Sequence, residues 1–189
     1  MTAPSLPILA SVFALALAGC VPLLPHTDWV PQMQGGKLVR ELCWGSPAIE
    51  YQAHGVVLIS RIGRWPDNRL RMEVRFTIPP GLTVTPLEPV VVVTAAGEVG
   101  RQVAIDGINR HGNPALPLTP PGQMKGYVLE IGRARPPGHY WLFVSLNARD
   151  SQNFSVTLSS LNINNTVVAI PPMHFSREMR LQLAAPLQC

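Results

Sequence analysis

Apolar and polar residues alternate along much of the chain, most clearly over residues 69–78, which read RLRMEVRFTI. Every second residue there is apolar, and the residues between are charged or polar. Side chains of a β-strand point alternately to its two faces, so this period of two predicts a half-buried strand. The apolar stretch 55–62 precedes it, and residues 66–68, Pro-Asp-Asn, favour a turn between the two. The pattern therefore predicts a β-hairpin over residues 55–78.

Other apolar stretches of strand length continue to the end of the chain. They are residues 38–43, 89–94, 99–105, 126–131, 139–146, 154–161, 166–170 and 179–184. Three Pro-Pro-Gly triplets, at 79–81, 120–122 and 136–138, interrupt them, because proline cannot donate to a strand ladder and glycine permits turns. Asn164-Asn165 favours the left-handed turn of a tight hairpin. We expect an all-β fold, a single antiparallel β-sandwich over residues 37–189.

Residues 136–144, PPGHYWLFV, are similar to the Pro-Gly-x-Tyr strand entry of immunoglobulin-like and transthyretin-like sandwich domains. The composition is consistent with such a domain. Hydrophobic residues make up 47% of the 189 residues and charged residues only 14%, a balance typical of one folded domain. The net charge is +4, but arginines are dispersed and there are only two lysines, so we expect no nucleic-acid partner.

The N-terminal segment suggests export. Residues 6–18 form an apolar run too short to span a bilayer, and the run ends in Leu17-Ala18-Gly19-Cys20. This ending resembles the lipobox of bacterial lipoproteins. The resemblance implies that residues 1–19 are a signal peptide, and that Cys20 becomes a lipidated N-terminus anchored in a membrane. The alternatives are a core helix or an uncleaved anchor that happens to end in a cysteine.

The residues after Cys20 indicate in which membrane the protein is anchored and how the domain is connected to it. Val21 stands where an Asp would retain a lipoprotein in the inner membrane, so the resemblance implies the outer membrane with the domain facing the periplasm. Exposure at the cell surface stays open. Residues 20–36 contain three prolines and end in Gly35-Gly36, which predicts a flexible tether. Alternatively, Leu23, Leu24 and Trp29 lie at the membrane interface or against a partner.

Two further cysteines follow Cys20. Cys43 and Cys189 would both reach an oxidising compartment after export, where disulfides persist. We expect them to form an intramolecular disulfide, the alternatives being two free thiols or an intermolecular bridge. A disulfide here would join the last residue to the first predicted strand and constrain the unfolded chain.

The sequence contains none of the local motifs that mark common catalytic or cofactor sites. Five histidines are scattered without a second ligand at metal-binding spacing. We therefore expect no catalytic residues, no cofactor, no metal and no enzymatic activity.

Arginines gather around a tryptophan in the predicted hairpin. The group consists of Arg61, Arg64, Trp65, Arg69, Arg71 and Arg75. Arginine pairs bidentately with phosphate and carboxylate, so this group is a candidate binding surface for an anionic glycan, a lipid phosphate or an acidic protein. The other interpretation is a solvated strand face whose charges protect a sheet edge.

Two function classes stay open. With the lipoprotein resemblance, the sequence favours a non-enzymatic accessory or assembly subunit of an envelope complex, held by a protein partner. The alternative is a ligand-binding module for anionic envelope glycan or lipid. A periplasmic hydrolase ranks third, because its catalytic groups would have to converge without a local motif.

Overall fold

The structure is a computed structural model, and it describes residues 23–40, 46–64, 69–110, 112, 117–126, 138–146 and 152–183. All regular secondary structure in these ranges is β-strand, which confirms the predicted all-β class. The chain divides into a larger unit, residues 28–178, and a smaller one, residues 1–27 with 179–189. None of the described elements is a helix long and apolar enough to cross a membrane.

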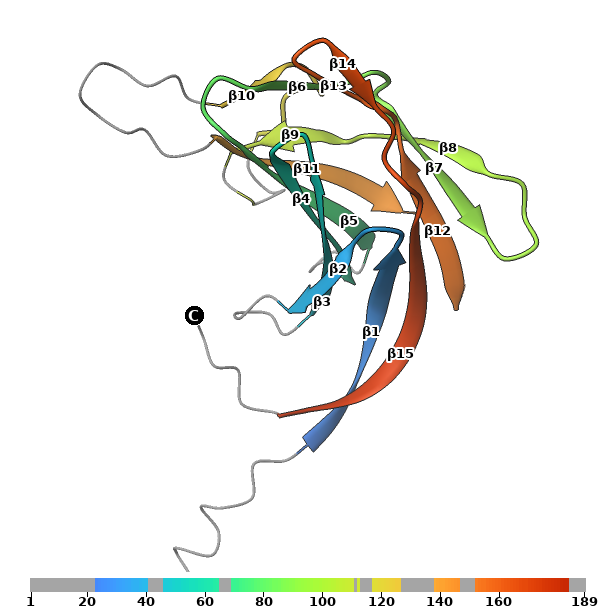
Figure 1. The fold of residues 1–189 in the computed structure, drawn as a ribbon. Helices are drawn as coiled ribbons and strands as arrows, with labels where there is room; N and C mark the ends of the chain where they lie inside the picture. Colours follow the sequence, from blue (N-terminus) through green and yellow to red (C-terminus); the bar gives the residue numbers. More distant parts are fainter. Residues whose placement is uncertain are drawn as a thin grey trace, which may run out of the picture. The chain divides into compact units, whose positions relative to one another are not determined.

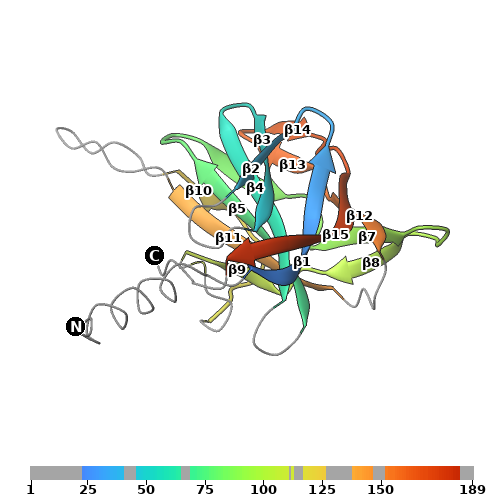
Figure 2. The ribbon, with the colours of Figure 1, turned by 90° about the horizontal axis from the view of Figure 1, so that it is seen from below.

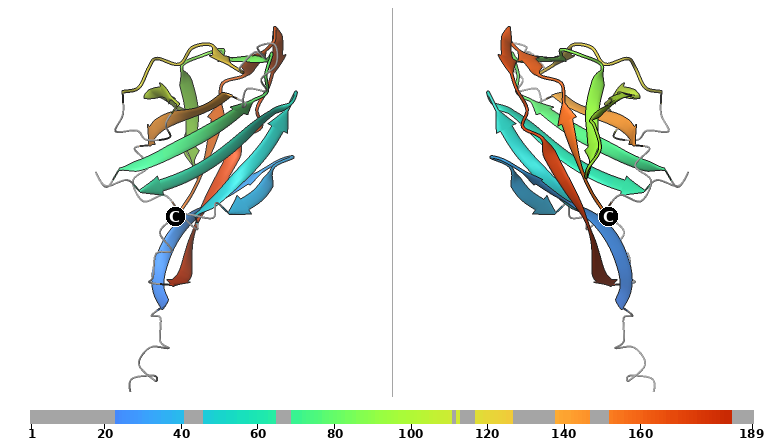
Figure 3. Two further views of the ribbon diagram at one scale, coloured as in Figure 1. Left: turned by 90° about the vertical axis from the view of Figure 1, so that its left-hand side faces the viewer. Right: turned by 90° about the vertical axis from the view of Figure 1, so that its right-hand side faces the viewer.

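A six-stranded sheet forms one layer of the larger unit, in the order β2-β3-β4-β5-β11-β9 (Figure 1, Figure 3). Its strands are β2 (Lys37–Arg40), β3 (Pro47–Ala53), β4 (Val56–Arg64), β5 (Leu70–Ile78), β11 (Gly138–Leu146) and β9 (Gly107–Asn109). Neighbouring strands run antiparallel, and β5 pairs with β11 along its whole length, from Leu70 opposite Leu146 to Ile78 opposite Gly138. The pairing of β4 with β5 confirms the predicted hairpin.

A second sheet has five strands in the order β1-β15-β12-β7-β8. They are β1 (Leu23–Met33), β15 (Met173–Leu183), β12 (Asn153–Leu158), β7 (Val90–Ala95) and β8 (Arg101–Ala104). Figure 2 shows β1 beside β15. A smaller sheet has the order β10-β6-β13-β14, formed by β10 (Met124–Lys125), β6 (Thr83–Pro86), β13 (Leu161–Ile163) and β14 (Thr166–Val168).

The core consists of apolar side chains from all three sheets. In β5 the residues that the alternation places on one face, such as Met72, Val74 and Phe76, are fully buried. From the five-stranded sheet, Phe154 and Phe175 stack with ring centroids 5.5 Å apart. This packing of inward faces makes the larger unit an antiparallel β-sandwich, as predicted.

The Asn164-Asn165 turn also confirms its prediction. The two residues have φ of 45° and 67°, in the left-handed region that asparagine tolerates, and they join β13 to β14. The Asn164 side chain adds a long-range contact, because its Oδ1 accepts a hydrogen bond from the Thr83 amide at 2.7 Å. The turn therefore joins β13 and β14 and ties them to β6.

The predicted tether is wrong for residues 23–33, which form β1. Trp29, Val30 and Met33 of this strand are buried. Its prolines suggested a linker, but β1 is an edge strand, where proline is tolerated because one side of the strand has no partner to bond. The folded domain thus includes residues that the sequence pattern assigned to a linker.

Strand boundaries differ elsewhere as well. The stretch 154–161 is divided between β12 and β13, and β15 begins at Met173, before the predicted start at residue 179. Strands β3, β6, β9 and β10 were not predicted. Residues 127–131 of one predicted strand lie outside the described residues, as do Cys20, Cys43, Cys189 and Trp65.

Candidate functional site

The outward face of β4 and β5 carries three of the predicted arginines. Arg61, Arg71 and Arg75 alternate with buried residues and are themselves half-buried, while Arg69 is exposed just before β5 begins. Arg71 and Arg75 thus emerge opposite the core, as the alternation over residues 69–78 predicts.

The charge of this face is largely compensated within the protein. Arg61 Nη2 donates a hydrogen bond to Glu73 Oε2 at 2.9 Å, and Glu73 is only 5% exposed. Arg71 Nε donates to Ser145 Oγ at 3.3 Å and lies 4.0 Å from Asp106 Oδ2. Ser145 Oγ in turn donates to that carboxylate at 2.8 Å. Arg61 and Arg71 therefore belong to a cross-strand network more than to an open basic surface.

Arg64 lies on the other side of the sheet from this network. It is the last residue of β4, and the alternation of the strand places it on the same face as the core residues Leu58 and Ile62. Its guanidinium carbon is 5.6 Å from the centroid of the Trp29 ring, and that of Arg177, in β15, is 6.0 Å from the same centroid. We call these three residues the Arg64–Trp29–Arg177 cluster.

Cation–π attraction at these distances holds both guanidinium groups near the indole. Trp29 is 6% exposed, whereas Arg64 and Arg177 are exposed. Among the described residues, no carboxylate forms an ion pair with either arginine. Neither guanidinium thus has an acidic partner among the described residues, and its N–H donors suit an anion such as a carboxylate or a phosphate. The cluster is the strongest candidate for an anion-binding site in the described part of the chain.

The sequence did not predict this cluster as a unit. Arg64 was in the predicted arginine group, Trp29 was named only as an alternative contact of the tether with a membrane or a partner, and Arg177 was not singled out. The three residues come from β1, β4 and β15, which are distant in the sequence and meet only through the sandwich. A local pattern gives no signal for such a contact.

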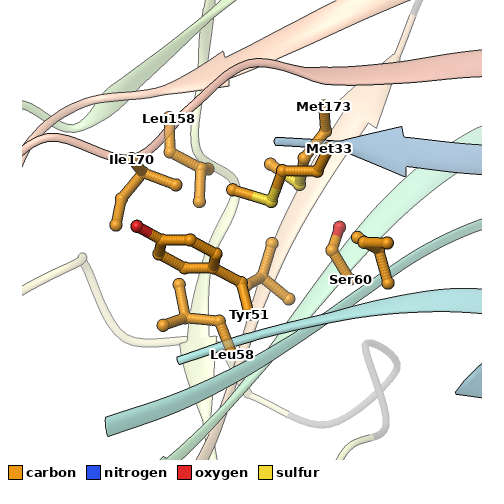
Figure 4. A pocket seen from close by; sticks show the side chains of 9 residues that line it. Met33, Tyr51, Leu58, Ser60, Leu158, Ile170 and Met173 are labelled. Atoms are coloured by element: carbon orange, nitrogen blue, oxygen red, sulfur yellow. The ribbon is translucent and has the colours of Figure 1, made fainter. Parts of the chain in front are cut away.

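The sandwich interior contains a small apolar cavity of about 10 Å³, drawn in Figure 4. Side chains from both large sheets line it, among them Met33, Tyr51, Ser60 and Met173. Its volume is about that of one water probe, whereas pockets for small molecules occupy roughly 300–1,000 Å³. The cavity in its present form is too small for an organic ligand.

Two open grooves on the surface are larger. The first, about 420 Å³, is lined by Arg110, Thr119, Gln123 and Tyr140, among other residues. Two of its polar side chains are engaged, since Arg110 Nη2 donates to Tyr140 Oη at 2.8 Å and that hydroxyl donates to the Lys125 carbonyl at 3.1 Å. The second groove, about 500 Å³, lies on the five-stranded sheet.

No group of three or more His, Cys, Asp or Glu side chains with metal-binding geometry occurs within the described ranges. Comparisons of the chain with protein-family profiles, with curated proteins and with solved structures give no match.

Proposed function

We propose that this protein is a non-enzymatic accessory subunit of a bacterial envelope complex, anchored to the outer membrane through lipid on Cys20 and facing the periplasm. It holds an acidic group of a partner protein at the Arg64–Trp29–Arg177 cluster. The observation that carries the proposal is the pair of guanidinium groups, both within 6.0 Å of one indole centroid and neither in an ion pair with a described carboxylate.

The chemistry of the cluster fits an interface. Arginine is enriched among the residues that dominate the binding energy of protein interfaces, because its planar guanidinium group makes directed hydrogen bonds to carboxylates. A carboxylate of a partner would gain charge-assisted hydrogen bonds from either guanidinium group. The buried indole, within 6.0 Å of both guanidinium carbons, would help to hold those groups in place.

The start of β1 supports a short connection to the membrane. β1 begins at Leu23, three residues after Cys20. Three residues reach at most about 11 Å, so a lipid on Cys20 would keep the start of β1 near the membrane surface. A partner would then have to be another envelope component within reach of that surface.

The alternative function, a module for anionic lipid or glycan, rests on the same cluster, because phosphate and carboxylate suit the same guanidinium groups. A photoreactive residue in place of Gln152 would separate the two in intact cells. Gln152 is exposed, and its carbonyl accepts the Arg177 amide at 2.8 Å. We expect one discrete protein adduct, which disappears in Arg64→Gln/Arg177→Gln.

The matched control is the same photoreactive residue at Val99, which is 93% exposed at the turn between β7 and β8. It should not give the same adduct. Lipid or glycan adducts alone at position 152 would favour the alternative function. Protein adducts that persist at full yield in the double variant would refute the proposed role of the cluster.

A measurement on purified protein tests anion binding itself. Ligands that bind only the folded state raise its stability, so phosphate at constant ionic strength should raise the melting temperature of the wild type. The rise should be smaller in Arg64→Gln/Arg177→Gln and unchanged in the control Arg101→Gln, whose arginine is exposed on β8. Equal rises in all three proteins would show that phosphate acts elsewhere.

A further inference from the structure

The larger groove of about 500 Å³ crosses four strands of the five-stranded sheet, on the face opposite the core. In the strand register, Ser155 of β12 lies opposite His174 of β15 and also opposite Thr94 of β7. The neighbouring row pairs Asn153 with Ser176. These five side chains, with Gln32 of β1, form what we call the polar groove.

The side chains of the polar groove keep their hydrogen-bonding capacity free of the described residues. No described residue forms a side-chain hydrogen bond with any of the six residues, although all are exposed or half-buried. By contrast, the smaller groove uses its Tyr140 hydroxyl and its Arg110 guanidinium internally. The polar groove therefore presents a row of hydroxyl, amide and imidazole groups to whatever occupies it.

The kind of ligand follows from these groups. Hydroxyl and amide side chains both donate and accept hydrogen bonds, and so do the hydroxyl groups of a sugar. The lining residues include no lysine or arginine to attract an anion, and they include Glu98, whose carboxylate would repel one. A volume of about 500 Å³ falls within the range of small-molecule sites.

We propose that the polar groove binds a neutral glycan, an oligosaccharide segment laid across β15, β12 and β7. Hydroxyl groups of successive sugars would exchange hydrogen bonds with His174, Ser155 and Thr94, and an adjacent sugar would contact Asn153 and Ser176. This activity is separate from the Arg64–Trp29–Arg177 cluster and does not depend on the function proposed above.

The test is isothermal titration of the full-length lipidated protein in a detergent without a sugar headgroup. The probes are maltohexaose, cellohexaose and chitohexaose, three neutral oligosaccharides with different linkages. We expect at least one to bind with a micromolar to millimolar Kd. Asn153→Ala/His174→Ala should weaken that binding by about tenfold or more, because each change removes a hydrogen bond to the ligand.

Thr157→Ala is the matched control, because Thr157 is on the same face of β12 but does not line the groove. It should change the Kd by less than about twofold. Thr94→Val keeps the side-chain shape and removes only the hydroxyl, so it tests the site if the double variant folds poorly. Arg64→Gln/Arg177→Gln should bind the oligosaccharide as the wild type does, which separates this proposal from the preceding one. Absence of binding by all three probes, or binding unaffected by the groove variants, would overturn the inference.

Discussion

Arg61 and Glu73 face each other across β4 and β5, and the guanidinium donates to the carboxylate at 2.9 Å on the outward side of the sheet. Glu73 is nearly buried there, so its charge depends on a partner for compensation. An arginine that the sequence suggested as a binding residue therefore has a structural role.

Arg61→Ala should lower the free energy of unfolding by about 1–3 kcal/mol, since it removes a main partner of a buried carboxylate. Replacing both residues, as Arg61→Ala/Glu73→Gln, should recover part of the loss because no unpaired charge remains. Urea denaturation measures both changes. The exposed Arg101→Ala on β8 is the control and should stay within about 0.5 kcal/mol of the wild type. If Arg61→Ala lowers the free energy of unfolding no more than this control does, the ion pair contributes nothing to stability.

Ser60→Ala should raise the free energy of unfolding by up to about 1 kcal/mol. Ser60 is 2% exposed, and its hydroxyl has no hydrogen-bond partner among the described residues. On folding, the hydroxyl therefore loses its hydrogen bonds to water without gaining new ones. Thermal denaturation is the measurement. Ser159→Ala is the matched control and should lower the free energy of unfolding, because Ser159 Oγ donates a hydrogen bond to the Glu88 carbonyl at 2.9 Å. A loss of stability in Ser60→Ala would mean that the hydroxyl has a partner, such as a water in the adjoining cavity.

The two turn asparagines should respond differently to substitution. Asn164→Ala should cost about 1–2 kcal/mol, because it removes the bond from the Thr83 amide at a residue with positive φ. Asn165→Gly should be neutral or slightly stabilising, since glycine adopts a φ of 67° without strain and no described side-chain hydrogen bond involves Asn165. Denaturation midpoints compare the two variants. Equal losses would show that the Asn165 side chain also stabilises the turn, and would contradict the special role of Asn164.

The disulfide between Cys43 and Cys189 stays a prediction from the sequence. Cys43→Ser and Cys189→Ser should each lower the melting temperature by a similar amount, and the double variant should lower it no further, because one bond is lost in every case. Alkylation of protein purified from the periplasm provides the direct check. Two thiols that react freely in the native protein would exclude the bond.

Lipidation of Cys20 likewise rests on the resemblance to a lipobox. Cys20→Ala should abolish incorporation of labelled fatty acid and release the protein from the membrane fraction, since no thiol remains to carry the lipid. Cys43→Ser is the control and should still be labelled. Continued labelling of the Cys20→Ala protein would contradict the assignment.

The regular alternation in residues 69–78 was enough to predict β5 and its hairpin with β4, because one buried face leaves a local signature. β3 has no such signature, since Pro47, Ala48 and Ile49 are consecutive buried residues. β1 was missed because its prolines resemble those of a linker, and only its position at a sheet edge makes them acceptable.

The candidate sites were harder to predict than the strands. Whether the charge of an arginine is compensated depends on a carboxylate across the sheet. Arg61 has such a partner in Glu73, whereas Arg64 has none among the described residues. The polar groove gathers single polar residues from strands that are far apart in the sequence, and each looks like an ordinary outward-facing residue in its own strand. Register between strands, which the sequence leaves open, determines both sites.

The position of β1 at the sheet edge has a mechanical consequence. β1 is hydrogen-bonded to β15, and the chain leaves its N-terminal end toward Cys20. A pull on that end acts along the strand, so the ladder between β1 and β15 is loaded in shear and its bonds share the force instead of breaking one at a time. If Cys20 carries the proposed lipid, a domain held by β1 in this way would resist a pull on that anchor more strongly than one whose terminal strand is peeled off sideways.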